Sequence, residues 1–270
     1  MQLAFIGGGV MAEAMIGGVL QKGLYPSQSI IASDIAPVRR DALTNKYRIE
    51  TVAENCRACR EAEMVVLAIK PQHLMAVMGD LHGQLSGDQL VLSVVAGARL
   101  STLRQGLKHE SIVRVMPNMP ARIGQGISAW TATPEVNPSQ REAARSILSA
   151  LGEEVFLPSE DYIDMATAVS GSGPAYFFLV LEALIDGAVH IGLPRDAAEK
   201  LVLQTALGSI KAAMEMGKHP AELRNMVTSS GGTTAEGLLR LEEGAVRADF
   251  MRAVIAAYEK AKQLGGSDGK

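Results

Sequence analysis

A glycine loop near the start of the chain limits the fold more than any other segment. The apolar run Leu3–Ile6 leads directly into Gly7–Ala12, and a helix-like spacing of apolar residues follows. The loop has the pattern G-x-G-x-x-A between a strand and a helix, which is the context of the dinucleotide-binding fingerprint. Gly7 would make the tight turn, Gly9 would let a pyrophosphate approach the backbone, and Ala12 would permit close helix packing. The alternative is a glycine-rich turn that binds no ligand.

Strands and helices alternate up to about residue 155. Further apolar strand runs occupy residues 29–33, 64–69, 89–95, 111–116 and 126–130, and a helical pattern follows the last of them. Continuous apolar runs are typical of strands in a parallel sheet that is covered on both faces. The alternation predicts an α/β fold with an N-terminal Rossmann-type doubly wound sheet.

The second half of the chain changes character, because residues 161–265 are almost wholly helical in pattern. A length of 270 residues favours two domains. We expect a dinucleotide-binding domain, 1–158, and an all-α substrate-binding and dimerisation domain, 159–270. Apolar helical segments such as 177–185 would bury surface against a second copy, which predicts a homodimer. The tail from Gly265 onward is expected to fray.

The net charge and the cysteine content limit which kinds of partner and metal the protein is expected to bind. The net charge is −3 and no basic cluster stands out, which argues against a nucleic-acid partner. Cys56 and Cys59 form a C-x-x-C pair, but a zinc site needs two more ligands at matching spacing and none is present, so no metal is expected. We expect two reduced thiols of a cytosolic protein, with a redox pair as the alternative.

No targeting segment is visible, since the chain enters its first strand at once, and a cytoplasmic location is expected. The most apolar segment, Ala175–Leu193, is interrupted by Glu182, Asp186 and His190. A buried core helix is therefore favoured over a membrane span, and no membrane partner is expected.

A second glycine loop precedes a late helix. Hydroxyl and glycine residues fill the segment Thr228–Thr234, and a helix-forming sequence follows. Glycines let a ligand approach the backbone, and the free N–H groups of a first helical turn bind anions. The alternative is an ordinary helix cap. One loop suited to a pyrophosphate and one suited to a small carboxylate together indicate a cofactor and a substrate.

The chain resembles the pyrroline-5-carboxylate reductase family, the last enzyme of proline synthesis, over nearly its whole length. The likeness rests on five segments: Phe5–Ala12, Ala68–Gln72, Val115–Pro120, Ser170–Tyr176 and Val227–Thr234. The last two are specific to the family, whereas the first is shared by many dehydrogenases. The resemblance implies reduction of L-1-pyrroline-5-carboxylate to L-proline by hydride transfer from NAD(P)H, in a homodimer or an assembly of dimers.

The resemblance also implies the site residues. The cofactor-binding residues would be Gly7, Gly9, Val10, Met11, Ser33, Asp34, Asn55, Ala68, Ile69, Lys70, Pro71, Ala96 and Gly97, and the substrate-binding residues Ser170, Ser229, Gly231, Gly232, Thr233 and Thr234. Backbone N–H groups of residues 231–233 would hold the substrate carboxylate. The Thr234 hydroxyl would bond the imine nitrogen as the catalytic group. The five histidines lie outside the five segments and are expected to be ordinary surface or core residues.

Two positions depart from the family pattern. Ser230 stands where many members have proline. Asp34 stands where members that prefer NADPH tend to carry a serine, or an arginine nearby. A carboxylate there hydrogen-bonds the 2′-hydroxyl of NADH and repels the 2′-phosphate of NADPH, whereas Arg39 and Arg40 would favour NADPH. We therefore expect NADP(H) as cofactor, with NAD(H) also accepted.

Two rival functions have weight. A β-hydroxyacid dehydrogenase of the same architecture would present a lysine on the first long helix of the second domain, but no lysine lies between Tyr176 and Ala198. A dinucleotide sensor with an inactive second site would not need the intact residues 231–234. A reductase acting on a different imine stays open.

Overall fold

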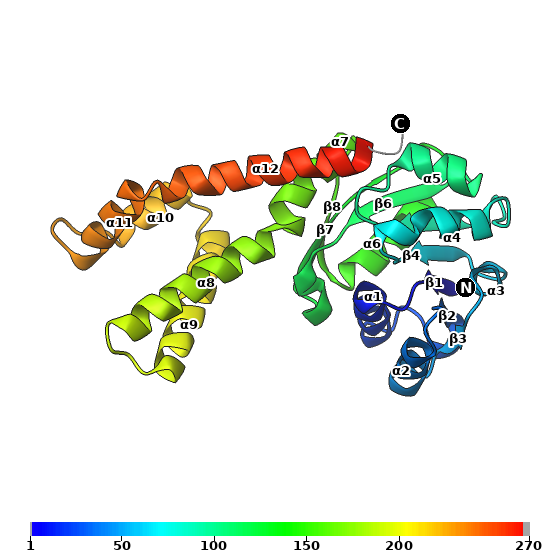
Figure 1. Cartoon of the computed structure of the whole chain (residues 1–270), viewed down its shortest axis with the longest axis horizontal. Coiled ribbons are helices and arrows are strands. Elements are labelled where there is room, and N and C mark those ends of the chain that lie inside the picture. The colour runs from blue at the N-terminus through cyan, green and yellow to red at the C-terminus, as the bar shows by residue number, and fades with distance from the viewer. Residues whose placement is uncertain (1, 267–270) are drawn as a thin grey trace. The chain divides into compact units, whose positions relative to one another are not determined.

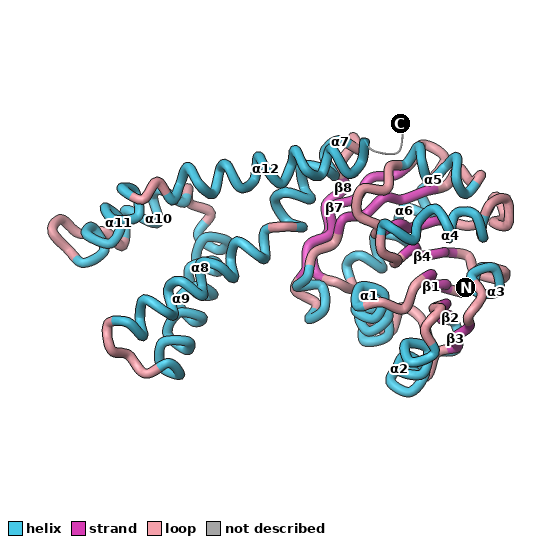
Figure 2. The backbone as a smooth tube through the Cα atoms, viewed as in Figure 1, coloured by secondary structure: helices cyan, strands magenta, loops and turns pink. Residues whose placement is uncertain are grey.

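The structure is a computed structural model that describes residues 2–266. The chain forms two compact units (Figures 1 and 2). The sheet unit comprises residues up to Ser172 together with the chain from Ala257 onward, and the helical unit comprises Gly173–Ala256.

The sheet unit contains one eight-stranded sheet with the strand order β3-β2-β1-β4-β5-β6-β7-β8. The strands are β1 (Leu3–Ile6), β2 (Ile30–Ser33), β3 (Glu50–Val52), β4 (Met64–Leu67), β5 (Leu90–Ser93), β6 (Ile112–Met116), β7 (Gly126–Ala132) and β8 (Gly152–Phe156). The first six strands are parallel and follow the order of a dinucleotide-binding sheet. Strand β7 pairs antiparallel with β6 and parallel with β8. The predicted doubly wound sheet is confirmed, and the six predicted strands are present to within two residues at either end.

Helices cover both faces of the sheet, because alternate strand residues enter two separate cores. Leu3 and Phe5 of β1 pack beneath α1 (Val10–Gln21), α2 (Pro37–Tyr47) and α6 (Pro138–Ser149). Ala4 and Ile6 face the core of α3, α4 and α5. These last helices span Asn55–Cys59, Leu74–Leu81 and Leu100–Leu107, and the short helices η1, η2 and η3 span Ser27–Ser29, Pro71–His73 and Met119–Ile123.

The helical unit, Gly173–Ala256, contains helices and no strand, and almost none of its side chains are buried. Its helices are α8 (Gly173–His190), α9 (Arg195–Met216), α10 (Pro220–Met226), α11 (Thr233–Glu243) and the first half of α12 (Val246–Gly266). In this unit, all of whose residues are described, Gly173 and Ala198 are the buried ones. The expectation of a buried core helix at Ala175–Leu193 is wrong for a single chain, since Phe177, Phe178 and Leu179 are exposed.

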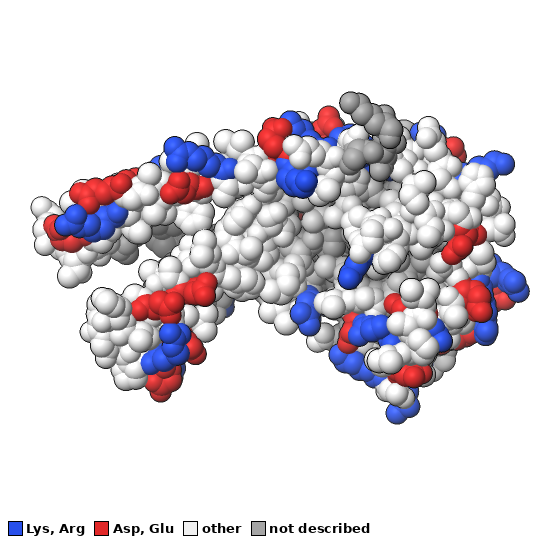
Figure 3. Space-filling view, in the orientation of Figure 1, with Lys and Arg blue, Asp and Glu red and all other residues white. Residues whose placement is uncertain are grey.

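One helical run, Asp161–His190, is long and apolar enough by length and composition to cross a membrane, considering the described residues alone. On the face shown in Figure 3, acidic and basic side chains are interspersed over the sheet unit, and uncharged side chains make up much of the visible surface of α8 and α9.

The two compact units divide the chain differently from the boundary expected between residues 158 and 159. Helix α7 (Asp161–Ala166) and the π-helical turn η4 (Thr167–Gly171) belong to the sheet unit. Buried Arg114 of β6 explains this, because it bonds Glu160 at 2.8 Å and Asp164 at 2.7 Å. The tail differs from expectation as well: Gly265 is helical and buried at the end of α12, and residues 267–270 lie outside the described part.

Candidate active site

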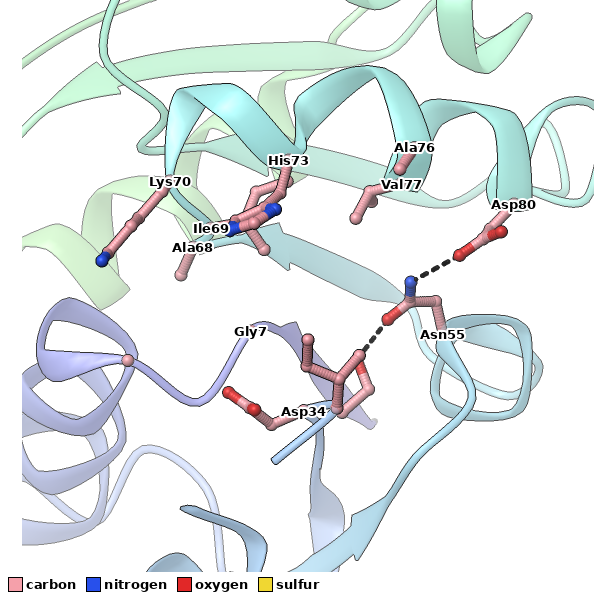
Figure 4. A pocket seen from close by; sticks show the side chains of 13 residues that line it. Gly7, Asp34, Asn55, Ala68, Ile69, Lys70, His73, Ala76, Val77 and Asp80 are labelled. Atoms are coloured by element: carbon pink, nitrogen blue, oxygen red, sulfur yellow. Dashed lines mark hydrogen bonds between the residues drawn. The ribbon is translucent and has the colours of Figure 1, made fainter. Parts of the chain in front are cut away.

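A cavity of about 380 Å³ opens at the carboxyl ends of β1, β2 and β4 (Figure 4). Carboxyl ends of parallel strands are where open α/β sheets bind their ligands. The cavity is lined by Gly7, Gly9, Ser33, Asp34, Ile35, Asn55, Ala68, Ile69, Lys70, His73, Ala76, Val77 and Asp80.

The glycine loop forms the floor of this cavity, and its first glycine admits no side chain. Gly7 has φ +93°, and a Cβ there would lie 2.7 Å from Ile69 Cγ2 and 2.8 Å from the Ala68 carbonyl oxygen. The Gly7 N–H donates to the Ser33 carbonyl at 2.8 Å, which holds the loop against β2. Gly9 precedes α1 as its N-cap and supplies no side-chain cap. The first-turn N–H groups of α1 are therefore not covered by a capping side chain, as an anion site requires.

Asp34 is held against the glycine loop by two backbone donors. Its Oδ2 accepts from the Gly8 N–H at 2.8 Å, and its Oδ1 accepts from the Ala36 N–H at 2.8 Å. A carboxylate oxygen has more than one lone pair, so each oxygen can still accept from a ribose hydroxyl. The carboxylate thus lies at the cavity with a fixed orientation.

The two arginines that follow Asp34 already have partners. Arg39 donates through Nε to the Gly8 carbonyl at 2.8 Å and through Nη2 to Glu13 at 2.9 Å. Arg40 donates through Nη1 to the carbonyls of Asp34 and Ile35, at 2.7 and 3.1 Å. Hydrogen bonds from Arg39 and then Lys46 lower the pKa of Glu13 below its ordinary value.

A chain of hydrogen bonds crosses the wall of the cavity. Ser33 Oγ donates to Asn55 Oδ1 at 2.8 Å, and Asn55 Nδ2 donates to Asp80 Oδ2 at 2.9 Å (Figure 4). Asn55 is the first residue of α3, and Asp80 lies near the end of α4. Both ends of the Asn55 amide are engaged, so its orientation at the wall is set by protein groups on either side.

Sequence reasoning missed five residues that line the cavity. These are Ile35, His73, Ala76, Val77 and Asp80. His73 closes the short helix η2 directly after Lys70 and Pro71. Its position three residues beyond a predicted site lysine was the available signal. The four others carry no pattern of their own and reach the wall through the packing of α4 and the turn after β2.

Eight predicted cofactor residues line the cavity: Gly7, Gly9, Ser33, Asp34, Asn55, Ala68, Ile69 and Lys70. Five do not: Val10, Met11, Pro71, Ala96 and Gly97. Val10 is exposed at the start of α1, Met11 packs partly against the core, and Pro71 opens η2. Ala96 and Gly97 lie in the turn after β5, where Gly97 has φ +76°.

The second glycine loop lies in the helical unit, before α11. Gly231 has φ +66°, and the Gly232 N–H donates to the Ser229 carbonyl at 3.1 Å. Gly232 itself is the N-cap of α11, and no side chain caps that helix. The ordinary helix cap that the sequence left open is thus formed by a glycine, without a side-chain hydrogen bond. Thr233 and Thr234 begin the helix, so their N–H groups have no acceptor one turn earlier within it.

Ser170 belongs to a different part of the molecule from the other predicted substrate residues. It lies in the π-helical turn η4 of the sheet unit, and its Oγ donates to the Ala166 carbonyl at 2.9 Å. Ser229, Gly231, Gly232, Thr233 and Thr234 lie in the helical unit. π-helical turns are rare and are frequent at functional sites.

The two cysteines differ in their surroundings. Both are free; Cys56 is exposed and Cys59 is buried in α3. Burial, and then the neighbouring Cys56 thiol, raise the pKa of Cys59 to about 12. Among the described residues there is no group of three or more histidine, cysteine or acidic side chains that could hold a metal ion.

Comparison with known proteins identifies relatives that match nearly the whole chain. The family model "Pyrroline-5-carboxylate reductase dimerisation" matches residues 160–264, and the model "NADP oxidoreductase coenzyme F420-dependent" matches residues 2–97. The pyrroline-5-carboxylate reductase of Synechocystis is 42% identical, over 98% of either chain. The structure of the reductase from Coxiella burnetii is similar, with a TM-score of 0.89 and 36% identity over 97% of this chain and 98% of that one. The pyrroline carboxylate reductase of Plasmodium falciparum, solved with NADP bound, gives a TM-score of 0.91 at 30% identity, over 98% of both. The chain belongs to the pyrroline-5-carboxylate reductase family.

Proposed function

We propose that this protein reduces L-1-pyrroline-5-carboxylate to L-proline with a reduced nicotinamide dinucleotide, the final step of proline biosynthesis. The observation that carries the proposal is the likeness to reductases of that name over 98% of both chains. A match of that extent includes the glycine loop at β1 and the second glycine loop at α11 together.

The residues of the cavity fit a dinucleotide. Gly7 and Gly9 line the cavity, and the space that a Gly7 side chain would need is filled by Ile69 and Ala68. The glycine loop and the start of α1 would hold the pyrophosphate, Asp34 the adenosine ribose, and Asn55 the adenosine side of the wall. Once bound, the cofactor supplies the hydride. NADP(H) is the cofactor, and we propose that NAD(H) is also accepted because of Asp34.

The second glycine loop would hold the substrate carboxylate at the start of α11. Gly232 already uses its N–H within the loop, so the donors left to a carboxylate are the N–H groups of Gly231 and Thr233. Ser229 would add a polar contact from the same loop. This refines the expectation that all three N–H groups of residues 231–233 bind substrate.

The Thr234 hydroxyl would bond the imine nitrogen and orient the ring for hydride delivery. A protonated imine is electrophilic by itself, so positioning accounts for the chemistry that the protein must supply. Thr234 is half-buried on the first turn of α11 and makes no capping bond there. Its hydroxyl is thus available for a ligand.

The helical unit would pair with a second copy. Its apolar side chains have almost no core to enter within one chain, and large ones are exposed along α8 and α9, among them Phe177, Leu179, Leu184, Leu201 and Leu207. Covering such a face stabilises a protein by about 25 cal/mol for each Å² of apolar surface removed from water. The family model that matches this region is described as a dimerisation unit, and we propose a homodimer or an assembly of dimers.

We also propose a cytoplasmic location, since Glu182 and Asp186 interrupt the apolar run of α8 and a partner would cover its remaining surface.

The experiment that tests the function follows the loss of reduced-nicotinamide absorbance with pyrroline-5-carboxylate, in parallel with NADPH and NADH. Turnover is expected with both cofactors, and the ratio of the two rates measures the effect of Asp34. Absence of turnover with either cofactor, although the dinucleotide binds, would overturn the proposal in favour of another imine substrate or a dinucleotide sensor.

A further inference from the structure

The turn between β5 and α5, residues 94–99, packs against the last turn of α12. Gly97 has φ +76°, and a Cβ placed on it would lie 3.3 Å from the backbone carbonyl and the Cβ of Leu264. Both segments belong to the sheet unit, although residues 97 and 264 are far apart in the sequence. The end of the chain's last helix therefore forms a wall for this turn.

Arg99 joins the same turn to two other elements. Its Nε donates to the Gly265 carbonyl of α12 at 3.0 Å, and its Nη2 donates to Asp164 Oδ2 of α7 at 3.3 Å. The Arg99 side chain is about one third exposed, whereas Asp164 is buried. A guanidinium can reach both acceptors at once because its donors are arranged in a rigid fork, which a lysine lacks.

The acceptor of Arg99 is itself held in place. Asp164 Oδ1 accepts from buried Arg114 at 2.7 Å, and Arg114 also bonds Glu160 at 2.8 Å. Glu160 in turn accepts from the Leu100 N–H, at the start of α5, at 2.7 Å. The β5–α5 turn is thus fixed at both Arg99 and Leu100 by one ion-pair network, which is buried at Arg114 and Asp164.

The β5–α5 turn lies at the same edge of the sheet as the cavity, next to the half of the site that would bind adenosine. The cavity is lined from β1, β2, β4 and the helices α3 and α4, which is the side of the sheet where Asp34 would bind the adenosine ribose. The β5–α5 turn follows at the same carboxyl edge beyond β4, since β5 pairs in register with β4. The other half of a dinucleotide extends over that edge in a doubly wound sheet.

We propose that Arg99 is a positioning residue that holds the β5–α5 turn against the end of α12 and thereby places the nicotinamide half of the cofactor. The proposal rests on the proposed function, since it concerns the reduced dinucleotide of that reaction. Arg99 itself acts through Gly97 and Leu100 rather than by contact with the reacting atoms.

The test separates the two halves of the cofactor. Arg99→Gln, Arg99→Lys and the control Arg145→Gln, which alters an exposed arginine of α6, are titrated with NADP⁺ and with 2′-phospho-ADP-ribose, which lacks nicotinamide. Arg99→Gln should weaken NADP⁺ binding several-fold and lower kcat by about 10- to 100-fold. Binding of 2′-phospho-ADP-ribose should stay within about twofold of the wild type. Arg99→Lys should restore little of the loss, because it cannot bond both acceptors.

A second variant keeps the proposal testable if Arg99→Gln does not fold. Gly265→Ala adds a Cβ 3.1 Å from Arg99 Nε and should displace that side chain, with the same selective effect on NADP⁺. Equal weakening of both ligands, or no change in either, would overturn the proposal. The binding comparison does not need pyrroline-5-carboxylate, so its outcome is independent of whether that substrate turns over.

Discussion

The two units contain the same kinds of apolar residue, but the sheet unit buries them and the helical unit exposes them. In the sheet unit, apolar side chains of every central strand enter one of two cores, and β1, β2, β4 and β5 are buried along their whole length. All residues of the helical unit are described, and Ala198 is the one residue among them whose apolar side chain is buried. The sheet unit is therefore complete in one chain, whereas the helical unit is a surface that needs a partner. Apolarity in a sequence says that a segment will be buried, but not in which copy of the chain.

The largest expected effect tests where the sheet unit ends. Asp164→Ala would leave the buried Arg114 guanidinium without its closest carboxylate, which costs about 3–5 kcal/mol of unfolding free energy. Denaturant unfolding followed by circular dichroism measures the loss. The control Glu259→Ala breaks an exposed pair with Lys262 on α12 and should leave the midpoint unchanged. A small loss for Asp164→Ala would mean that α7 contributes little to the sheet unit.

The next prediction compares leucines from the two units. Leu92→Ala in fully buried β5 should cost about 2–5 kcal/mol, independent of protein concentration. Leu179→Glu on α8, where the leucine is 63% exposed, should instead convert dimer to monomer in sedimentation experiments. Val38→Glu, at an exposed valine of α2, is the matched control and should remain dimeric. If Leu179→Glu also remains dimeric at micromolar concentration, the face of α8 is not the interface.

A third prediction concerns chemistry in the unit that lacks a core. Thr234→Ala should lower turnover about 100-fold by loss of substrate positioning, while NADP⁺ affinity and thermal stability stay nearly constant. The neighbouring Ser230→Ala is the control, because no substrate contact is proposed for that residue. Steady-state kinetics with pyrroline-5-carboxylate measure the effect. Wild-type turnover in Thr234→Ala would remove this threonine from the mechanism.

The smallest effect belongs to a buried thiol of the sheet unit. Burial raises the pKa of Cys59 to about 12, from 9.0 in an exposed thiol. The unfolded chain therefore ionises first, and stability falls as pH rises above about 9, by about 1.4 kcal/mol per pH unit until the folded thiol ionises too. Cys59→Ala should have a shallower decline than the wild type, measured as unfolding free energy from pH 8 to pH 10. Cys56→Ala should retain the wild-type decline, and equal slopes in all three proteins would contradict the assignment.

The fold of the sheet unit could be predicted from the sequence because its signals are local. Strand β1 and the turn at Gly7 can be recognised within ten residues, and the alternation of strands and helices predicts a doubly wound sheet. Strands β3 and β8 were not predicted, since Glu50–Val52 and Gly152–Phe156 are short, partly exposed and defined by their pairing with neighbours. The expected domain boundary differs from the compact units because the bonds of Arg114 to Glu160 and Asp164 join residues about fifty positions apart.

The candidate site could be predicted where a motif places backbone at a strand end, as at Gly7, Asp34 and Ala68–Lys70. It could not be predicted where a side chain reaches the wall through helix packing, as Val77 and Asp80 do. The engagement of Arg39 by Gly8 and Glu13 was equally invisible in the sequence, and it bears directly on cofactor choice.

The return of α12 to the sheet unit has a consequence for synthesis of the chain. Residues 257–266 contribute Leu264 and Gly265 to the wall behind Gly97 and Arg99, although the rest of the sheet unit precedes residue 173. The ribosome therefore makes nearly the whole sheet unit before the helical unit, and residues 257–266 only after it. Until residues 257–266 have been made, the β5–α5 turn lacks the contacts of Gly97 with Leu264 and of Arg99 with Gly265.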